Sequence, residues 1–210
     1  TTKLQCQLIP VLTEQGRMVG AMVNGQEIRA RCGVVLACGG FPHDVARKKA
    51  LLPHAPTGQE HWSAASRGNT GDGLRLGEAV GGQVARDAVQ AAALAPVSLV
   101  PRADGSVAHF PHLVERAKPG LIAVTVAGQR FTNEADSYYD FVSGMLAGTP
   151  AGAPVQAWLV CDHAFIRHYG LGAVKPAPMP MGAMIKNGYL KRGKTLTELA
   201  AACGIDPAGL

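Results

Sequence analysis

The sequence lacks several features that would each point to a particular class of protein. A membrane-spanning helix needs about 18 consecutive apolar residues, and the longest apolar runs, such as Ala91 to Val100 with Pro96 inside it, are much shorter. The chain is therefore expected to have no membrane span. None of its five cysteines forms a C-x-x-C pair: Cys6, Cys32, Cys38, Cys161 and Cys203. Their odd number and spacing favour a reducing compartment, the cytoplasm, over a disulfide framework.

Metal and nucleic-acid binding also find little support in the sequence. His109 and His112 have a spacing seen in metal sites, but Pro111 lies between them and no cysteine or acidic cluster accompanies them. We therefore predict no metal site. The 20 Lys and Arg exceed the 15 Asp and Glu, yet the densest basic group, residues 191–194, has no aromatic neighbours within it. A solvated basic surface that can attract anionic ligands is expected, and not a nucleic-acid interface.

The composition is that of a globular chain with real hydrophobic cores. Its 210 residues, 47% of them hydrophobic, suffice for one large domain or two small ones. The chain begins at Thr1 without a methionine and shows no signal peptide, so we interpret its first residue as an artificial or processed boundary. The proline-containing stretch 87–118 has little clear period, and we place the border between two domains near residue 96.

The first part is predicted to open with a β-meander that leads into an interior strand. Alternating apolar residues up to Pro10 indicate one strand and residues 18–23 a second. Asn24-Gly25 is a strong hairpin signal, so residues 26–31 should pair back. The continuous apolar run Val34 to Cys38 is typical of a strand that is buried on both faces.

Helices and further strands are expected along the rest of the chain. Pro42-His43-Asp44 begins a helix over 45–52, and the Asp72 carboxylate is expected to cap a helix over 74–80 that ends at Gly81-Gly82. The second part should hold these elements: strands 121–126, 129–131 and 155–160, a helix that begins after Asn133, a helix over 164–169, and a last helix with the capping box Thr195-x-x-Glu198 that ends at Gly204.

Two glycine-bearing segments of the first part are candidates for a ligand site. Ala37-Cys38-Gly39-Gly40 ends the predicted strand, and glycines there would let the backbone approach a flat, bulky ligand. A tight turn explains the same pattern. Thr70-Gly71-Asp72 precedes a helix whose free N–H groups favour an anion or a polarised carbonyl, although Asp72 can also serve as a helix cap alone.

The segment Gly128 to Phe141 is predicted to be a strand-to-helix corner rich in polar and aromatic side chains. Arg130, Asn133 and Glu134 are best explained as fixing the corner by ion pairs and a helix cap. Tyr138 and Tyr139 are neighbours on the expected helix and point about 100° apart. At most one of the two should therefore face a bound ligand, and the other should pack.

The order of these motifs resembles one flavoprotein family. Ala-Cys-Gly-Gly-Phe, then Asn-Thr-Gly-Asp-Gly, then Arg-Phe-x-Asn-Glu after a hairpin is similar to the family of fumarate reductase flavoprotein subunits and 3-ketosteroid Δ1-dehydrogenases. The resemblance implies a mixed α/β and α+β fold. Residues 1–96 would form part of a Rossmann-type FAD-binding domain, and residues 97–210 an incomplete α+β capping domain. It also implies FAD beside seven residues: Ala37, Cys38, Gly39, Gly40, Thr70, Gly71 and Asp72.

The same resemblance suggests an internal piece of a longer enzyme. The G-x-G-x-x-G fingerprint and the acidic residue that follows it are absent and would precede Thr1, and a C-terminal segment that completes the flavin site is missing as well. Alone, the chain is expected to be inactive and not to retain FAD.

Tyr138 is the residue that distinguishes between members of this family. In fumarate reductases an arginine occupies the fourth position after the Glu of Arg-Phe-x-Asn-Glu, and that position here is Tyr138, as in ketosteroid dehydrogenases. The resemblance thus implies a catalytic Tyr138 in a reaction that desaturates a ketone or enone substrate next to its carbonyl. The electron acceptor is open. Fumarate-reductase-like chemistry and a non-catalytic binding or assembly module are the alternatives.

Overall fold

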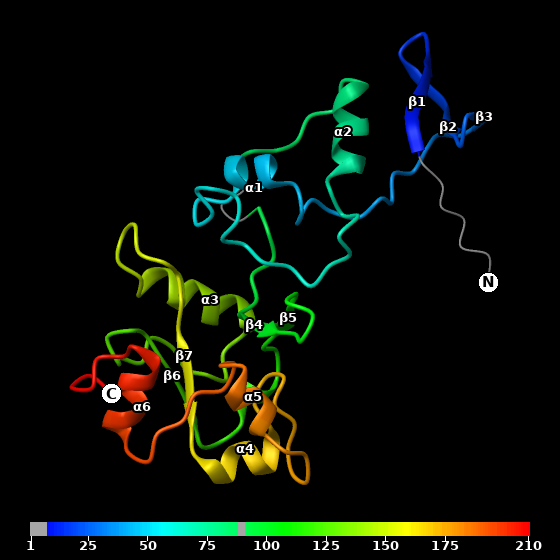
Figure 1. The fold of residues 1–210 in the computed structure, drawn as a ribbon. Coiled ribbons are helices and arrows are strands. Elements are labelled where there is room, and N and C mark those ends of the chain that lie inside the picture. The colour runs from blue at the N-terminus through cyan, green and yellow to red at the C-terminus, as the bar shows by residue number, and fades with distance from the viewer. Residues whose placement is uncertain (1–7, 88–90) are drawn as a thin grey trace. The chain divides into compact units, whose positions relative to one another are not determined.

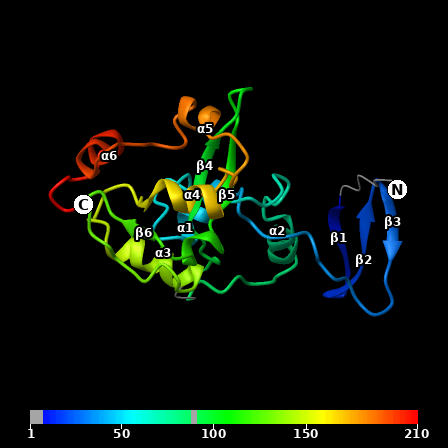
Figure 2. The same ribbon diagram turned by 90° about the horizontal axis from the view of Figure 1, so that it is seen from below.

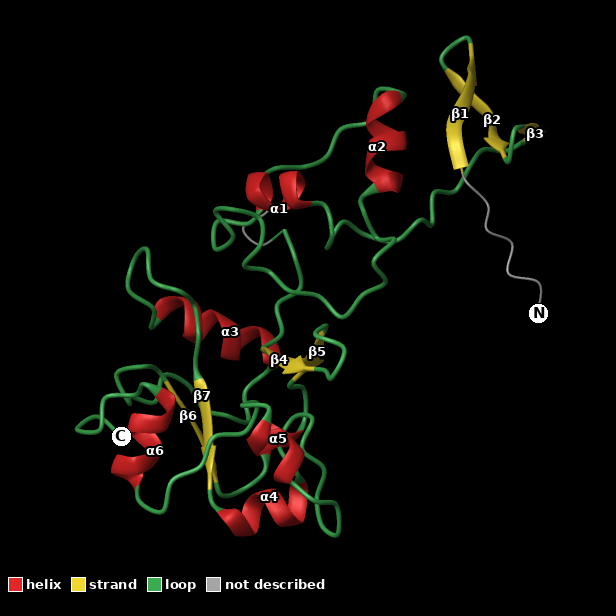
Figure 3. Ribbon diagram, viewed as in Figure 1, coloured by secondary structure: helices red, strands yellow, loops and turns green. Residues whose placement is uncertain are grey.

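The computed structural model describes residues 8–87 and 91–210 (Figure 1). Helices alternate with small antiparallel sheets in this part of the chain (Figure 3), which confirms the mixed α/β class. The chain divides into two compact units: unit 1 holds residues 1–61 and 65–91, and unit 2 holds residues 62–64 and 92–210. The main division thus falls between residues 91 and 92. The sequence analysis placed this border slightly later, near residue 96. The assignment of the two parts to an FAD-binding and a capping domain stays a prediction.

Unit 1 begins with the predicted meander, whose three strands lie side by side in Figure 2. They are β1 (Leu8–Glu14), β2 (Arg17–Val23) and β3 (Gln26–Arg29). Val23 pairs with Gln26 across a turn in which Asn24 and Gly25 have φ angles of 50° and 79°. These positive angles belong to the tight hairpin turn that Asn-Gly favours, so the hairpin prediction is confirmed. Residues 4–7 of the first predicted strand lie outside the described residues.

The predicted buried strand over Val34 to Cys38 is wrong. This segment is irregular, and Val35 is 90% exposed. An interior strand needs a neighbour on each edge, and no strand among the described residues pairs with this one. Exposure alternates along the segment, so that Leu36 and Cys38 are half-buried. A Cβ built on Gly73 would lie 3.9 Å from the Leu36 Cβ atom and 3.6 Å from the Cys38 Cβ atom. One face of this extended segment therefore lies against the helix that contains Gly73.

The two helices of unit 1 form where they were expected, but one of them begins differently. Helix α1 (Val45–Leu51) is capped by Asp44, whose carboxylate accepts the Arg47 N–H at 3.0 Å. Helix α2 (Asp72–Ala79) starts two residues before the predicted bound, and its N-cap is Gly71 in the left-handed conformation. Asp72 is therefore not the cap. It is the first helical residue, because a glycine can take the left-handed angle at no steric cost.

Unit 2 contains two antiparallel pairs of strands and four α-helices in its described residues. Strands β4 (Val97–Pro101) and β5 (Val107–Pro111) form a hairpin that the sequence analysis missed. Strand β6 (Leu121–Val124) pairs with β7 (Trp158–Cys161). The predicted partner strand 129–131 is reduced to one bridge between Val124 and Arg130. The remaining elements are a 3₁₀ helix (Glu115–Ala117), α3 (Tyr138–Ala147), α4 (His163–Tyr169), α5 (Gly182–Lys186) and α6 (Leu196–Cys203).

A small core holds α6 against the β6–β7 pair. Val124 and Ala200 are buried together with Ile205, and Trp158 and Val160 of β7 pack against them. The predicted capping box is confirmed, since Thr195 Oγ1 accepts the Glu198 N–H at 3.1 Å. The search for a helix long and apolar enough to cross a bilayer found none among residues 8–87 and 91–210.

Candidate functional site

The two glycine-bearing segments predicted to bind a cofactor come together in unit 1. The Gly71 N–H donates to the Gly40 carbonyl at 3.1 Å, and the His43 N–H donates to the Asn69 carbonyl at 3.1 Å. A Cβ on Gly39 would lie only 2.6 Å from Asn69 Oδ1. Residues about thirty positions apart in the sequence thus form one continuous surface.

Exposure differs among the seven predicted cofactor-binding residues. Ala37, Gly39 and Gly40 are exposed, so a ligand can approach their backbone. Cys38 and Thr70 are half-buried and Gly71 is buried. Gly39 has φ +80°, an angle that L side chains rarely adopt, and its glycine is required by this angle and by the contact with Asn69.

Asp72 gives this surface its charge. Its exposed carboxylate accepts the Thr70 hydroxyl at 3.0 Å and is paired with Arg75. Arg75 also donates to the Thr70 carbonyl at 2.5 Å. A carboxylate at the start of α2 accepts hydrogen bonds from hydroxyl groups and repels phosphate. This acceptor fits a polyhydroxyl group, such as the ribityl chain or ribose of FAD, and Arg75 offsets the negative charge of Asp72.

An ion pair ties α1 to α2 below this surface. Arg47 donates through Nη1 and Nη2 to the two carboxylate oxygens of Glu78, at 3.1 and 2.8 Å. The hydrogen bond from Arg47 is the main reason why the pKa of Glu78 lies below its usual range. The geometry is bidentate, which fixes direction as well as distance. The spacing between the two helices, and so the position of residues 70–72, is set by this pair.

The strand-to-helix corner of unit 2 is held by a network around Glu134. Arg130 donates to both carboxylate oxygens at 2.9 and 2.5 Å, and the Ala123 N–H donates to one of them at 2.8 Å. The buried Arg116 donates to the Glu134 carbonyl at 2.5 Å. Burial alone would raise the pKa of the Glu134 carboxyl, but these hydrogen bonds outweigh it and lower the pKa. Asn133 Oδ1 accepts the Ala135 N–H at 3.1 Å. The predicted ion pair of Arg130 with Glu134 is confirmed. The predicted helix cap is wrong, because Asn133 caps a turn and the helix begins only at Tyr138, with Ser137 as its N-cap.

The network positions Tyr138 as the first residue of α3. Ser137 is the N-cap and its hydroxyl oxygen accepts the Asp140 N–H at 3.1 Å. Tyr138 is 46% exposed, and its neighbour Tyr139 is 36% exposed. Neither tyrosine is buried, so the packing expected for one of them is not seen. No hydrogen bond of either phenol hydroxyl is formed within the described part of the chain.

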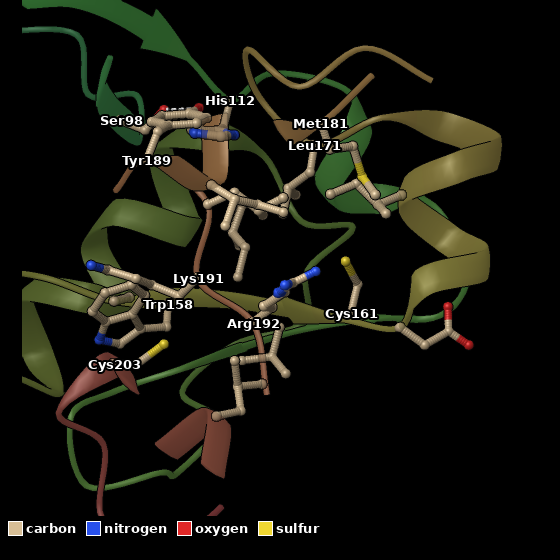
Figure 4. A pocket seen from close by; sticks show the side chains of 18 of the residues that line it. Ser98, His112, Trp158, Cys161, Leu171, Met181, Tyr189, Lys191, Arg192 and Cys203 are labelled. Atoms are coloured by element: carbon tan, nitrogen blue, oxygen red, sulfur yellow. Dashed lines mark hydrogen bonds between the residues drawn. The ribbon is translucent and has the colours of Figure 1, made fainter. Parts of the chain in front are cut away.

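Unit 2 also contains a cavity of about 640 Å³ that the sequence analysis did not predict (Figure 4). Phe141 and Met145 of α3 line it, whereas Tyr138, one turn earlier on the same helix, does not. Most of its wall is apolar. The polar and charged side chains that line it are Ser98, His112, Asp162, His163, Tyr189, Lys191 and Arg192.

Hydrogen bonds join several of these polar groups. The Ser98 and Tyr189 hydroxyls lie 2.7 Å apart, and the Tyr189 hydroxyl oxygen accepts the Ala173 N–H at 3.0 Å. His112 Nδ1 contacts the Glu115 carboxylate. Burial would raise the pKa of Glu115, but the hydrogen bond with His112 lowers it below its usual value. On the opposite wall, burial and then Asp162 raise the pKa of the Cys161 thiol to about 11.

Sequence reasoning considered His112 only as half of a metal pair with His109. The structure separates their roles, because His109 Nδ1 contacts the Ser63 carbonyl while His112 turns to Glu115. No group of three or more possible metal ligands exists among the residues that the structure describes. The signal for His112 was the carboxylate three residues later, at Glu115, where a 3₁₀ helix begins. Tyr189 had no such signal.

Comparison with known proteins identifies a family and several relatives. The family model described as "FAD binding domain" matches residues 3–210. The chain is 38% identical over 200 residues to the 4-oxocyclohex-2-ene-1-carboxylate 5-dehydrogenase of Sinomonas cyclohexanicum, covering 94% of this chain and 34% of that protein. It is 33% identical over 186 residues to the 3-oxosteroid 1-dehydrogenase of Mycobacterium tuberculosis (strain ATCC 25618 / H37Rv), covering 86% and 31%. The chain thus spans about a third of the length of these relatives.

Two solved structures resemble the whole chain. The first is the 3-ketosteroid Δ1-dehydrogenase of Sterolibacterium denitrificans in complex with 1,4-androstadiene-3,17-dione, with a TM-score of 0.77 and 31% identity. It matches 98% of this chain and 37% of that one. The second, an open conformation of a flavocytochrome c3 fumarate reductase, has a TM-score of 0.53 and 22% identity and matches 98% and 33%. The second likeness concerns the fold alone.

Proposed function

We propose, from the premise that this chain belongs to the FAD binding domain family, that the whole protein is a dehydrogenase that oxidises a carbon–carbon bond next to a ketone. The observation that carries this proposal is the 38% identity, over 94% of the chain, to a relative named for the dehydrogenation of a cyclic oxo acid. The structural likeness to a 3-ketosteroid Δ1-dehydrogenase supports the same class of reaction. A cyclic ketone or enone is the proposed substrate.

We further propose that unit 1 contributes part of a Rossmann-type FAD-binding domain and unit 2 part of a capping domain. Seven residues would hold FAD: Ala37, Cys38, Gly39, Gly40, Thr70, Gly71 and Asp72. The exposed backbone at Gly39 and Gly40 supports close approach of a flat ring, and the Asp72 carboxylate supports hydrogen bonds to cofactor hydroxyls. Bound FAD supplies the hydride acceptor for the oxidation.

Tyr138 is proposed as the residue that handles a proton. Tyr138 is exposed at the start of α3, and the Glu134 network holds the corner that leads into this helix. A phenol can donate a hydrogen bond to a ketone oxygen, which acidifies the adjacent C–H, or can assist in removing that proton. Both roles need the hydroxyl oxygen itself. The proposal includes a cytoplasmic location, which the cysteine pattern favours, and it leaves the electron acceptor open.

Replacement of the phenol tests this role. In the whole protein, Tyr138→Phe should lower turnover of a 3-oxosteroid or a cyclohexanone by about 100-fold or more, while FAD content and thermal stability stay unchanged. Tyr139→Phe is the matched control, because it removes the same atom from the neighbouring, differently directed residue and should leave turnover unaffected. An unchanged rate for Tyr138→Phe would return this tyrosine to a non-catalytic role.

A further inference from the structure

The cavity of unit 2 has the size and the wall of a small-molecule site. Its volume of about 640 Å³ lies within the range of about 300–1,000 Å³ that such sites occupy. Six of the apolar side chains on its wall are Phe141, Met145, Leu159, Ile166, Leu171 and Met181. They come from α3, β7, α4 and the segment after it. An apolar ring would lose its contact with water on several sides here, which favours binding.

Two cations line the same cavity without acidic partners. Lys191 and Arg192 lie on the segment between α5 and α6, and neither forms an ion pair with any residue that the structure describes. The one carboxylate on the wall belongs to Asp162, which is the N-cap of α4 and accepts the Phe165 N–H at 2.7 Å. The wall therefore carries an excess of positive charge that a ligand can neutralise.

Lys191 lies near a cysteine thiol of the cavity wall, and its charge acts on that thiol. Burial raises the pKa of Cys203, which also lines the cavity, and the charge of Lys191 offsets part of this increase. In Figure 4 the Arg192 guanidinium extends toward Cys161, whereas the Lys191 side chain extends in the opposite direction, past Trp158. Arg192 is thus placed to meet an anion inside the cavity, and Lys191 adds positive charge on the other side of the segment.

Uncharged polar groups gather at a second place on the wall. Ser98 and Tyr189 share a hydrogen bond, and His112 lies beside them (Figure 4). A Cβ built on Gly172 would lie 2.2 Å from the Tyr189 hydroxyl and 2.9 Å from His112 Cε1, which shows that these two side chains converge. His112 Nδ1 is engaged by Glu115, while Nε2 has no hydrogen-bond partner among the described residues. A carbonyl or hydroxyl group of a ligand could form hydrogen bonds with these side chains.

We infer that this cavity binds an apolar ring that carries one carboxylate, with Arg192 on the carboxylate and the His112–Tyr189 group on a second polar substituent. Arg192 can bind the carboxylate through two parallel hydrogen bonds. The inference concerns binding alone. It therefore stands or fails separately from the reaction proposed for Tyr138, whose side chain does not line the cavity.

Calorimetric titration of the purified protein with three matched probes tests the inference. Cyclohexanecarboxylate should bind more tightly than cyclohexanol, and cyclohexylamine should bind most weakly, since the same ring then carries an anionic, a neutral or a cationic substituent. Arg192→Gln should weaken binding of the carboxylate about ten-fold. Lys191→Gln should weaken it less, because its side chain extends away from Arg192, and both variants should bind cyclohexanol as before. Both residues are exposed, so the melting temperature should not change.

Lys194→Gln is the control, because it removes the same charge from the same segment at a position that does not line the cavity. It should bind cyclohexanecarboxylate as the unmodified protein does. Equal affinities for the three probes, no binding of any probe, or an equal loss in the Lys194 variant would each overturn the inference. The last result would assign the effect to general surface charge.

Discussion

The Glu134 carboxylate joins Arg130 and the backbone of β6 at a single point. Its Oε1 atom accepts both the Arg130 Nε–H at 2.9 Å and the Ala123 N–H at 2.8 Å. Ala123 is fully buried, while the Arg130 side chain is 55% exposed. The two hydrogen bonds to one oxygen therefore differ in environment, and they should differ in their contribution to stability.

Replacing Glu134 should destabilise the fold more than replacing Arg130. Glu134→Ala leaves the buried Ala123 N–H without an acceptor, which costs about 1–3 kcal/mol. Glu134→Gln keeps an acceptor oxygen for Ala123 and should have an intermediate effect. Arg130→Ala removes a partner that is mostly in water, where ion pairs contribute little. The measurement is the free energy of unfolding in urea, and a larger loss for Arg130→Ala than for Glu134→Ala would contradict this order.

Gly39 should not tolerate a side chain, although its neighbour should. Gly39→Ala places a Cβ at 2.6 Å from Asn69 Oδ1 and imposes φ +80° on an L-residue, which costs about 1–2 kcal/mol for the backbone alone. We expect lower thermal stability and, in the whole protein, less bound FAD. Gly40→Ala is the comparison for stability, because the nearest atom to its Cβ would be Pro42 Cδ at 3.6 Å. Equal melting temperatures for the two variants would argue against the Gly39 contact.

Local signals in the sequence predicted local structure well. The Asn24-Gly25 turn, the capping box at Thr195 and the left-handed Gly204 that ends α6 all depend on residues within a few positions of one another. Such interactions are satisfied by the segment itself. The Asp104-Gly105 signal of the missed β4–β5 hairpin was equally local, since Ser106 donates its N–H to Asp104 Oδ1 at 2.9 Å. The prolines around it concealed the strands.

Long-range relationships could not be predicted in the same way. Val34 to Cys38 has the composition of an interior strand, but composition does not provide a neighbouring strand to pair with. The cavity of unit 2 depends on Ser98 and Tyr189, which are 91 positions apart and meet through one hydroxyl pair. In contrast, the two glycine-bearing segments were predicted to lie at one site, because their order along the chain resembles that in a flavoprotein family. Neither segment alone indicates that they meet.

Cys161 should react slowly with alkylating reagents. Burial raises the pKa of its thiol to about 11 from 9.0, so its thiolate fraction at pH 8 is about 100-fold lower than that of an unperturbed thiol. Cys32 is exposed and should be modified first. The measurement is mass-spectrometric mapping of iodoacetamide labelling over time at pH 8. Labelling of Cys161 as fast as Cys32 would show that its thiol is not protected in this way.

Protonation of His61 should reduce the stability of unit 1 in mild acid. His61 Nδ1 lies 3.0 Å from His54 Nε2, and Lys48, which is buried, donates to the His61 carbonyl at 3.0 Å. Burial, then His54 and Lys48, lower the pKa of His61 to about 4 from 6.5. The folded state therefore binds this proton more weakly than the unfolded chain does. Its contribution to stability is complete above pH 6.5 and is lost as the pH falls from 6.5 toward 4.

Unfolding in urea at pH 7.5 and pH 5.5 measures this effect before most carboxyl groups titrate. The free energy of unfolding should fall between the two pH values, and His61→Gln should reduce the difference because the variant cannot bind the proton in either state. His168→Gln removes an exposed histidine of unit 2 and should keep the pH dependence of the unmodified protein. If the His61 variant kept the full difference, the proton taken up on unfolding would belong to another group. His54 would be the next to replace, since burial lowers the pKa of its ring as well.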